Sequence, residues 1–221
     1  MNTKKTLLLS LPLVGLAAAP VSAAMTASAT TELNLRSGPG PQYSVESVIP
    51  STEEVDVMGC LADAEWCEVS YQGTSGWAYS AYLTTPVEDE PVVIYENRDR
   101  VEVKTVTYDD TSNAAAGAGV GGAWGAAVGS LIVGGPAAVA AGAVIGAVAG
   151  AANNVEEKTV TYIQSNPVEP VYLDGEIAVG AGIPQEIEVY EVPESDYAYL
   201  NVNQQPVVID PETRRIVKIV R

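Results

Sequence analysis

The sequence predicts a mainly β protein with three folded parts: a small β-barrel, a helical hairpin rich in glycine and alanine, and a small C-terminal β-meander. Short runs rich in β-branched and aromatic residues alternate with glycine and proline turns at both ends of the chain. Between them lies a long stretch without charged side chains, in which glycines recur every four residues. We assign 1–23 to a signal peptide, 28–85 to the barrel, 86–112 to an acidic linker and β-prone segment, 113–154 to the helical hairpin and 155–221 to the C-terminal β unit.

The N-terminus has the three-part layout of a secretory signal peptide. Lys4 and Lys5 precede an apolar run, and small residues follow at the positions that a signal peptidase recognises. We expect cleavage after Ala23, with Ala24 as the alternative. An uncleaved anchor helix is the other possible interpretation, but the apolar run is short for a bilayer core of about 30 Å. The sequence therefore predicts export to the periplasm or cell envelope.

The chain is acidic, with a formal net charge of −17, and it contains no histidine. Removing the predicted signal peptide removes two lysines and no acid, which makes the charge more negative still. Such a chain has no electrostatic reason to bind nucleic acid, whose affinity for proteins depends on Lys and Arg. The absence of histidine removes the commonest general base and metal ligand at neutral pH.

Cys60 and Cys67 are the two cysteines, and they flank a predicted turn. In an exported protein such a pair is most simply a structural disulfide. Two thiols are too few for a metal site, so we expect neither a metal nor another cofactor.

Residues 28–85 contain short β-type runs between turns that are rich in glycine and proline. The expected strands are Tyr43–Ile49, Glu54–Gly59, Trp66–Tyr71 and Gly76–Tyr79. Several short strands separated by regular turns are typical of a small barrel.

The order of motifs in this region resembles the bacterial SH3 (SH3b) family. The residues that carry the resemblance are Leu33–Gly40, Tyr43, Trp66–Val69, Gly76–Ala78 and Tyr82–Leu83. The resemblance implies an SH3-like β-barrel that targets or binds in exported and wall-associated proteins. It implies peptidoglycan or an envelope protein as the partner.

Most of the matching residues are expected to support the fold. We expect core positions at Leu35, Val48, Val57, Trp66, Val69 and Leu83, and turn requirements at Gly38, Gly40 and Gly76. The candidate ligand-binding residues are Asn34, Arg36, Tyr43, Trp77 and Tyr79, because aromatic rings with polar tips suit sugar and peptide contacts. A role in packing or turn support is the alternative for each of them.

Two glycine series in the charge-free stretch favour closely packed helices. The expected helix-packing glycines are Gly117, Gly121, Gly125, Gly129, Gly142, Gly146 and Gly150. A spacing of four places each series along one helix face, where a second helix can approach closely. The pattern resembles the glycine zippers of envelope proteins.

A loosely ordered linker is the alternative, because glycine costs about 1 kcal/mol against alanine in an exposed helix. The regular spacing argues against a linker. Membrane association and self-association into a homo-oligomer remain open for the predicted hairpin. Each arm has close to the roughly 20 residues that a transmembrane helix needs.

An eight-residue segment, Val101–Tyr108, recurs at Val155–Tyr162 with one difference, Val103 against Glu157. The copies flank the glycine series. Since a helical hairpin brings its ends together, we expect the two β-prone copies to pair as antiparallel neighbours. We also expect a β-hairpin over 92–108 that turns near Asn97–Asp99.

The C-terminal region contains further β-type runs separated by turns. The expected strands are Gly175–Val179, Ile187–Val192, Tyr197–Val202, Val207–Asp210 and Ile216–Val220. Residues 170–176, Val192–Pro193 and Val207–Val217 resemble an uncharacterised domain of secreted alphaproteobacterial proteins, domain of unknown function 1236. We expect Arg214 and Arg215 to pair with nearby carboxylates.

Catalysis is not expected. No serine or cysteine has a histidine partner, and no pair of carboxylates is marked out as a glycosidase site. The sequence therefore favours an exported envelope adaptor. A purely structural, self-assembling envelope protein is the alternative, and a wall-active hydrolase is a more remote one.

Overall fold

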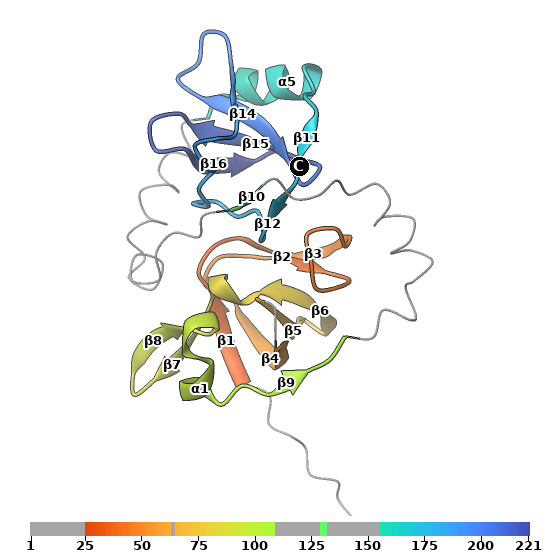
Figure 1. Ribbon diagram of the computed structural model, residues 1–221, viewed down its shortest axis with the longest axis vertical. Coiled ribbons are helices and arrows are strands. Elements are labelled where there is room, and N and C mark those ends of the chain that lie inside the picture. The colour runs from red at the N-terminus through yellow and green to blue at the C-terminus, as the bar shows by residue number, and fades with distance from the viewer. Residues whose placement is uncertain (1–24, 63–64, 109–128, 132–154) are drawn as a thin grey trace, which may run out of the picture.

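The computed structural model describes residues 25–62, 65–108, 129–131 and 155–221 (Figure 1). The predicted signal peptide and most of the expected helical hairpin lie outside these residues. The described part of the chain is mainly β, as predicted, and it forms two units. We call the unit built from residues 25–108 the barrel and the unit built from residues 155–221 the C-terminal module.

The barrel is a nine-stranded sheet that bends around one apolar core. Its strand order is β3-β2-β6-β5-β4-β1-β7-β8, and β9 pairs with β4. The strands are β1 Met25–Ala29, β2 Leu33–Arg36, β3 Val45–Ile49, β4 Glu54–Leu61, β5 Trp66–Tyr71, β6 Thr74–Tyr79, β7 Leu83–Val87, β8 Glu90–Val93 and β9 Thr105–Val106. The predicted strands of this region are therefore present, with small shifts at their ends.

Five of the six expected core residues are buried: Leu35, Val57, Trp66, Val69 and Leu83. The sixth prediction is wrong, because Val48 on edge strand β3 is only half-buried.

Gly76 also differs from expectation, since it lies within β6 and not in a turn. A Cβ there would lie 2.7 Å from the backbone oxygen of Arg36. Glycine is therefore required at this position for the close approach of β2 to β6.

The predicted disulfide is confirmed between Cys60 and Cys67. The two residues are direct partners across the antiparallel pair β4–β5, and both are buried in the barrel core. The disulfide therefore links the two strands next to the turn of this hairpin.

The segment expected as an acidic linker forms the turn of the β7–β8 hairpin, in which Val87 is paired with Glu90. The expected hairpin around Asn97–Asp99 is wrong. The chain forms a 3-10 turn, η2 (Tyr95–Asn97), and the short helix α1 (Arg98–Val101) there. Strand β9 then runs parallel to β4, so this segment extends the barrel sheet.

The C-terminal module is a five-stranded sheet that is covered on both faces. Its elements are α5 Glu157–Ser165, β11 Pro170–Val171, β13 Tyr190–Glu191, β14 Ala198–Val202, β15 Gln205–Asp210 and β16 Arg215–Ile219. Strands β14, β15 and β16 form the predicted antiparallel meander. Alternate residues such as Val208 and Val217 pack with Ile163 of α5, while their neighbours Ile209 and Ile216 pack on the opposite face.

The expectation for Gly175–Val179 is wrong, because the regular strand here is the preceding β12 (Leu173–Asp174). Strand β10 (Gly129–Ser130) pairs with β12 in parallel, and Leu131 is buried in the core of the C-terminal module. Gly129 was expected in a packed helix, and this expectation is also wrong, since the residue lies in a strand. The other six glycines of the two series lie outside the described residues.

The two copies of the repeated segment adopt different structures. Residues Val101–Tyr108 run from the end of α1 through β9 on the barrel, whereas Val155–Tyr162 lead into helix α5. The predicted antiparallel pairing is therefore wrong, because β9 has β4 as its partner and the second copy is mostly helical. No helix within the described ranges is long and apolar enough to span a membrane.

Candidate functional site

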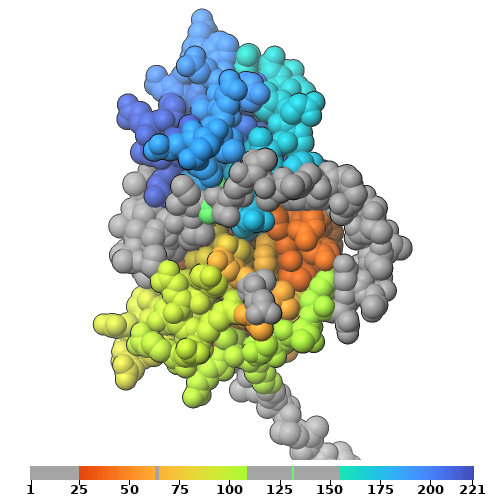
Figure 2. All heavy atoms as spheres, in the orientation of Figure 1, coloured from red at the N-terminus to blue at the C-terminus, as the bar shows by residue number. Residues whose placement is uncertain are grey.

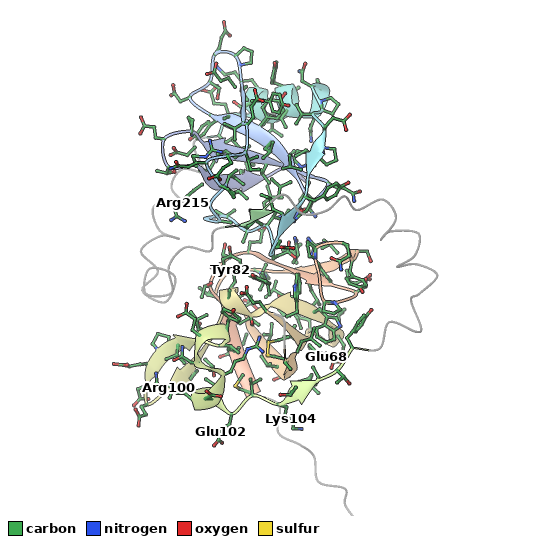
Figure 3. The ribbon with its side chains drawn as sticks, in the orientation of Figure 1. Glu68, Tyr82, Arg100, Glu102, Lys104 and Arg215 are labelled. Atoms are coloured by element: carbon green, nitrogen blue, oxygen red, sulfur yellow. A yellow bond between two sulfur atoms is a disulfide. The ribbon has the colours of Figure 1, made fainter. Side chains whose placement is uncertain are left out.

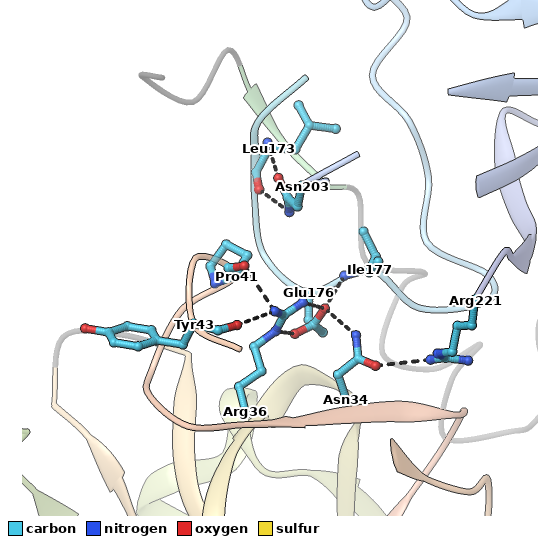
Figure 4. Close-up of polar contacts among 9 residues, drawn as sticks. All are labelled: Asn34, Arg36, Pro41, Tyr43, Leu173, Glu176, Ile177, Asn203 and Arg221. Atoms are coloured by element: carbon cyan, nitrogen blue, oxygen red, sulfur yellow. Dashed lines mark hydrogen bonds and ion pairs between the residues drawn. The ribbon is translucent and has the colours of Figure 1, made fainter. Parts of the chain in front are cut away.

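The predicted ligand-binding residues Asn34 and Arg36 lie on β2, at the face of the barrel that meets the C-terminal module (Figure 4). Both are buried, and Glu176 of the C-terminal module, which is 0% exposed, lies between them. Space-filling spheres show the C-terminal module resting against the barrel at this level (Figure 2). The candidate site is therefore filled by another part of the same chain.

Arg36 binds the Glu176 carboxylate with two of its nitrogens. Its Nε forms an ion pair with Oε2, and its Nη2 donates to Oε1 at 2.7 Å. The remaining nitrogen, Nη1, donates to the backbone oxygens of Pro41 at 3.1 Å and Tyr43 at 2.7 Å. These two carbonyls belong to the barrel, so the barrel itself orients the guanidinium in a plane suited to a carboxylate.

Glu176 has further partners on both sides of the contact. The Asn34 side-chain amide donates to Oε1 at 3.1 Å, and the backbone N–H of Ile177 donates to the same oxygen at 2.9 Å. A buried carboxylate is tolerated only when its charge and lone pairs are satisfied. Here one cation and two neutral donors fulfil that requirement.

The C-terminal module fixes the backbone on each side of Glu176. The Asn203 side chain, in the β14–β15 turn, accepts from Leu173 N and donates to Leu173 O, both at 2.9 Å. Gly175 then adopts φ +97°, a left-handed conformation that favours glycine and turns the chain. Beyond the contact, Arg215 donates to the backbone oxygen of Gly180 at 2.6 Å. The carboxylate is thus presented by a segment held at both ends.

Polar contacts surround this buried pair. Thr31 Oγ1 donates to the backbone oxygen of Val179 at 3.2 Å. Arg221 forms an ion pair with Glu32 and donates to Asn34 Oδ1 at 3.1 Å. Ala178, which is 0% exposed, is the one residue of the C-terminal module that belongs to the core cluster of the barrel, as far as the structure describes the chain.

Tyr82 lies at the top of the barrel, on the side of the C-terminal module (Figure 3). Its side chain is almost fully buried, and its hydroxyl has no hydrogen-bond partner among the described residues. Burial raises the pKa of this phenol strongly, and the negative charge of Glu176 raises it further. The site therefore holds a neutral tyrosine beside the buried ion pair.

The other three predicted residues have aromatic neighbours. The Tyr79 hydroxyl lies 3.4 Å from the position that a Cβ would take on Gly175, so this ring also reaches the C-terminal module. Tyr43 and Trp77 instead form T-shaped ring pairs with Tyr108, with ring centroids 5.7 Å and 5.4 Å away. Tyr43 and Tyr108 are half-buried, so solvent can reach the candidate ligand-binding surface at these two rings.

Sequence reasoning missed Glu176, Tyr82, Tyr108 and Arg221. The expected carboxylate partners of Arg214 and Arg215 are absent in the described structure, where Arg214 donates to the backbone oxygens of Ile183, Pro184 and Ile187. Glu176 stands in an Asp-Gly-Glu sequence within a chain of many acids, so nothing in its neighbourhood marked it as a partner of Arg36.

Two parts of the chain match known families. Residues 31–84 match the family described as "Bacterial SH3 domain", and residues 162–221 match "Domain of unknown function (DUF1236)". These matches confirm the resemblance of the first region to the SH3b family and of the second to domain of unknown function 1236. The match to the bacterial SH3 family thus lies within the barrel, and the match to DUF1236 lies within the C-terminal module.

A further similarity is to a Bacillus subtilis protein, YrvJ, whose name describes it provisionally as an N-acetylmuramoyl-L-alanine amidase. The two are 34% identical over 58 residues, which cover 26% of this chain and 11% of that protein. The matched segment of this chain therefore spans about a tenth of the length of the Bacillus protein.

Proposed function

We propose that this protein is an exported binding protein of the bacterial cell envelope, and that its barrel binds peptidoglycan or an envelope protein. The observation that carries the proposal is the convergence of all five candidate residues around β2, β6 and the turn between β2 and β3. The match to the bacterial SH3 family and the short similarity to a protein provisionally named an N-acetylmuramoyl-L-alanine amidase support a wall-related role. Catalysis is not part of the proposal.

The accessible part of this surface is formed by the half-buried rings of Tyr43 and Tyr108, which pack against the buried Trp77. Aromatic rings offer apolar faces to sugars and peptides at a small cost in conformational entropy. The polar end at Asn34 and Arg36 is covered by the C-terminal module. We therefore assign the first contact with the wall to the rings of Tyr43 and Tyr108.

Co-sedimentation of the full chain with purified, insoluble peptidoglycan tests the proposal. We expect the chain to pellet with peptidoglycan, and Tyr43→Ala to lower the bound fraction severalfold. Tyr190→Ala is the matched control, because Tyr190 is an exposed aromatic residue of the C-terminal module. If the chain stays in the supernatant and no envelope protein is captured by cross-linking from Tyr43, the binding function is wrong.

Export is tested separately, by cell fractionation and by sequencing the N-terminus of the mature protein. We expect a periplasmic or envelope protein that begins at Ala24, next to the first residue of β1. A mature chain that still carries Lys4 and Lys5 would favour an anchored form.

Self-assembly through the glycine series is the competing proposal, in which the barrel is only a folded spacer. The regular glycine spacing at Gly117–Gly125 and Gly142–Gly150 is its support. Sedimentation velocity of the full chain distinguishes the two proposals: a large assembly that is lost on Gly121→Leu, together with no peptidoglycan binding, favours the structural role.

A further inference from the structure

We propose that the Asn34–Arg36 face of the barrel is a binding site for a peptide carboxylate, and that the chain's own C-terminal module occupies it with Glu176. The module and an acid-bearing peptide then compete for the barrel. The inference rests on the proposed binding role of the barrel and specifies the chemistry of its ligand.

The barrel side of the contact has the chemistry of a carboxylate receptor. Arg36 presents two parallel donors, from Nε and Nη2, and Asn34 adds a third from its amide. Two-point binding by a guanidinium is the geometry that proteins use to recognise carboxylates. Because Nη1 is held by the carbonyls of Pro41 and Tyr43, the guanidinium is oriented by bonds within the barrel.

The occupant is a short segment, comparable to a bound peptide. Gly175 to Val179 has no regular secondary structure, and it contributes a turn glycine, one carboxylate and one small apolar residue to the contact. Ala178 fills a position in the core cluster of the barrel. A peptide with a carboxylate two residues before a small apolar side chain would reproduce these contacts.

The contact between the two units contains the buried ion pair and several hydrogen bonds, and Ala178 is the residue of the C-terminal module that joins the described core cluster of the barrel. The apolar cores of the C-terminal module form separate clusters, which include no residue of the barrel. Polar interfaces between domains are typical of units that separate and reassociate. Tyr108 and Gly129 are separated by 20 residues, and a chain of this length spans at most about 66 Å. The connection therefore permits exchange without unfolding of either unit.

The energetics of the ion pair also favour exchange over permanent closure. The free-energy cost of removing two charges from water is nearly as large as the free energy gained from their attraction. The ion pair therefore adds little net stability. Removing Glu176 without a replacement leaves Arg36 with an uncompensated charge. Replacing it by another carboxylate restores the same interactions, and a competing peptide therefore displaces the module at little cost.

The test measures binding of a labelled peptide with the sequence of residues 172–180, capped at both ends, to the full chain. We expect Glu176→Ala to bind the peptide at least tenfold more tightly than the unmodified chain, whose site is filled. Glutamine in place of the peptide's glutamate should abolish the gain, and so should Arg36→Gln combined with Glu176→Ala.

Arg221→Gln provides a second variant that leaves no buried charge unpaired. It removes the contacts of Arg221 with Glu32 and Asn34 at the edge of the interface. We expect an affinity for the peptide between those of the unmodified chain and Glu176→Ala.

Two results would overturn the inference. One is equal peptide binding by the unmodified chain, Glu176→Ala and Arg221→Gln. The other is a gain that does not depend on Arg36 or on the peptide carboxylate. Since no peptidoglycan is present, these results are independent of the co-sedimentation result that decides the proposed function.

Discussion

Arg36 and Glu176 lie 140 residues apart in the chain and form an ion pair in which their side chains are 3% and 0% exposed. One belongs to a bacterial SH3 domain and the other to a domain of unknown function. The ion pair therefore connects the region that matches the bacterial SH3 family with the region that matches DUF1236. It lies at the face of the barrel where the sequence predicts ligand binding.

The first prediction concerns the stability of this junction. We expect Arg36→Met to destabilise the docked state by about 3–5 kcal/mol, because it leaves the buried carboxylate of Glu176 without its cation. Urea denaturation measures the effect, either as a lower free energy of unfolding or as a split into two transitions when the units separate.

The exposed pair Glu156–Lys158 is the control, with side chains 66% and 58% exposed. Lys158→Met is expected to change the free energy of unfolding by less than about 1 kcal/mol. A change on Arg36→Met as small as that of the control, with one transition retained, would show that the buried pair does not hold the units together.

The second prediction concerns the disulfide Cys60–Cys67, whose cysteines are seven positions apart. Replacement of both by serine is expected to lower the free energy of unfolding by about 2.5 kcal/mol, from the loop-closure entropy of so short a loop. Denaturation with and without a reductant measures it. The reductant should destabilise the unmodified chain and leave the double variant unchanged; equal sensitivity of both would contradict the prediction.

The third prediction concerns pH and Tyr82. Burial and the charge of Glu176 raise its pKa above the ordinary value of about 10, so above pH 10 the unfolded chain loses this proton while the folded chain keeps it. Stability is therefore complete below pH 10 and decreases as the pH rises, by up to about 1.4 kcal/mol per pH unit from this group.

Tyr82→Phe isolates this contribution, because the hydroxyl has no partner in the described structure and its removal costs no hydrogen bond. We expect the variant to be as stable as the unmodified chain at pH 8 and more stable at pH 11, as measured by denaturation at both values. Parallel curves for the two proteins would show that Tyr82 ionises in the folded state.

The barrel strands and the C-terminal meander were predictable because alternating residues and turn chemistry are local signals. The two-residue turn at Gln72–Gly73, with φ of +49° and +83°, is an example. The contact between Arg36 and Glu176 was not predictable in this way. It joins two side chains through tertiary structure alone, and the sequence offered 28 acidic residues as partners.

The repeated segment also shows that local sequence does not determine structure by itself, because seven identical residues adopt two different structures. In the first copy Val103, Val106 and Tyr108 pack against the barrel core. In the second copy Glu157 is exposed in the first turn of α5, where a negative charge favours the helix N-terminus. The one differing position thus takes an apolar residue where it packs and a charged residue where it is solvated.

The last prediction exchanges these residues. Val103→Glu is expected to lower the free energy of unfolding by about 1–3 kcal/mol, because a partly buried apolar side chain becomes a charge against the barrel core. Glu157→Val is the matched control, and it should cost less than about 1 kcal/mol through the lost helix-terminus charge. Urea denaturation measures both, and hydrogen exchange at Cys60 N–H, which donates to Lys104 O at 2.8 Å, reports on the docking of β9. We expect faster exchange at Cys60 in Val103→Glu alone; equal exchange in the two variants would mean that Val103 does not hold this strand on the barrel.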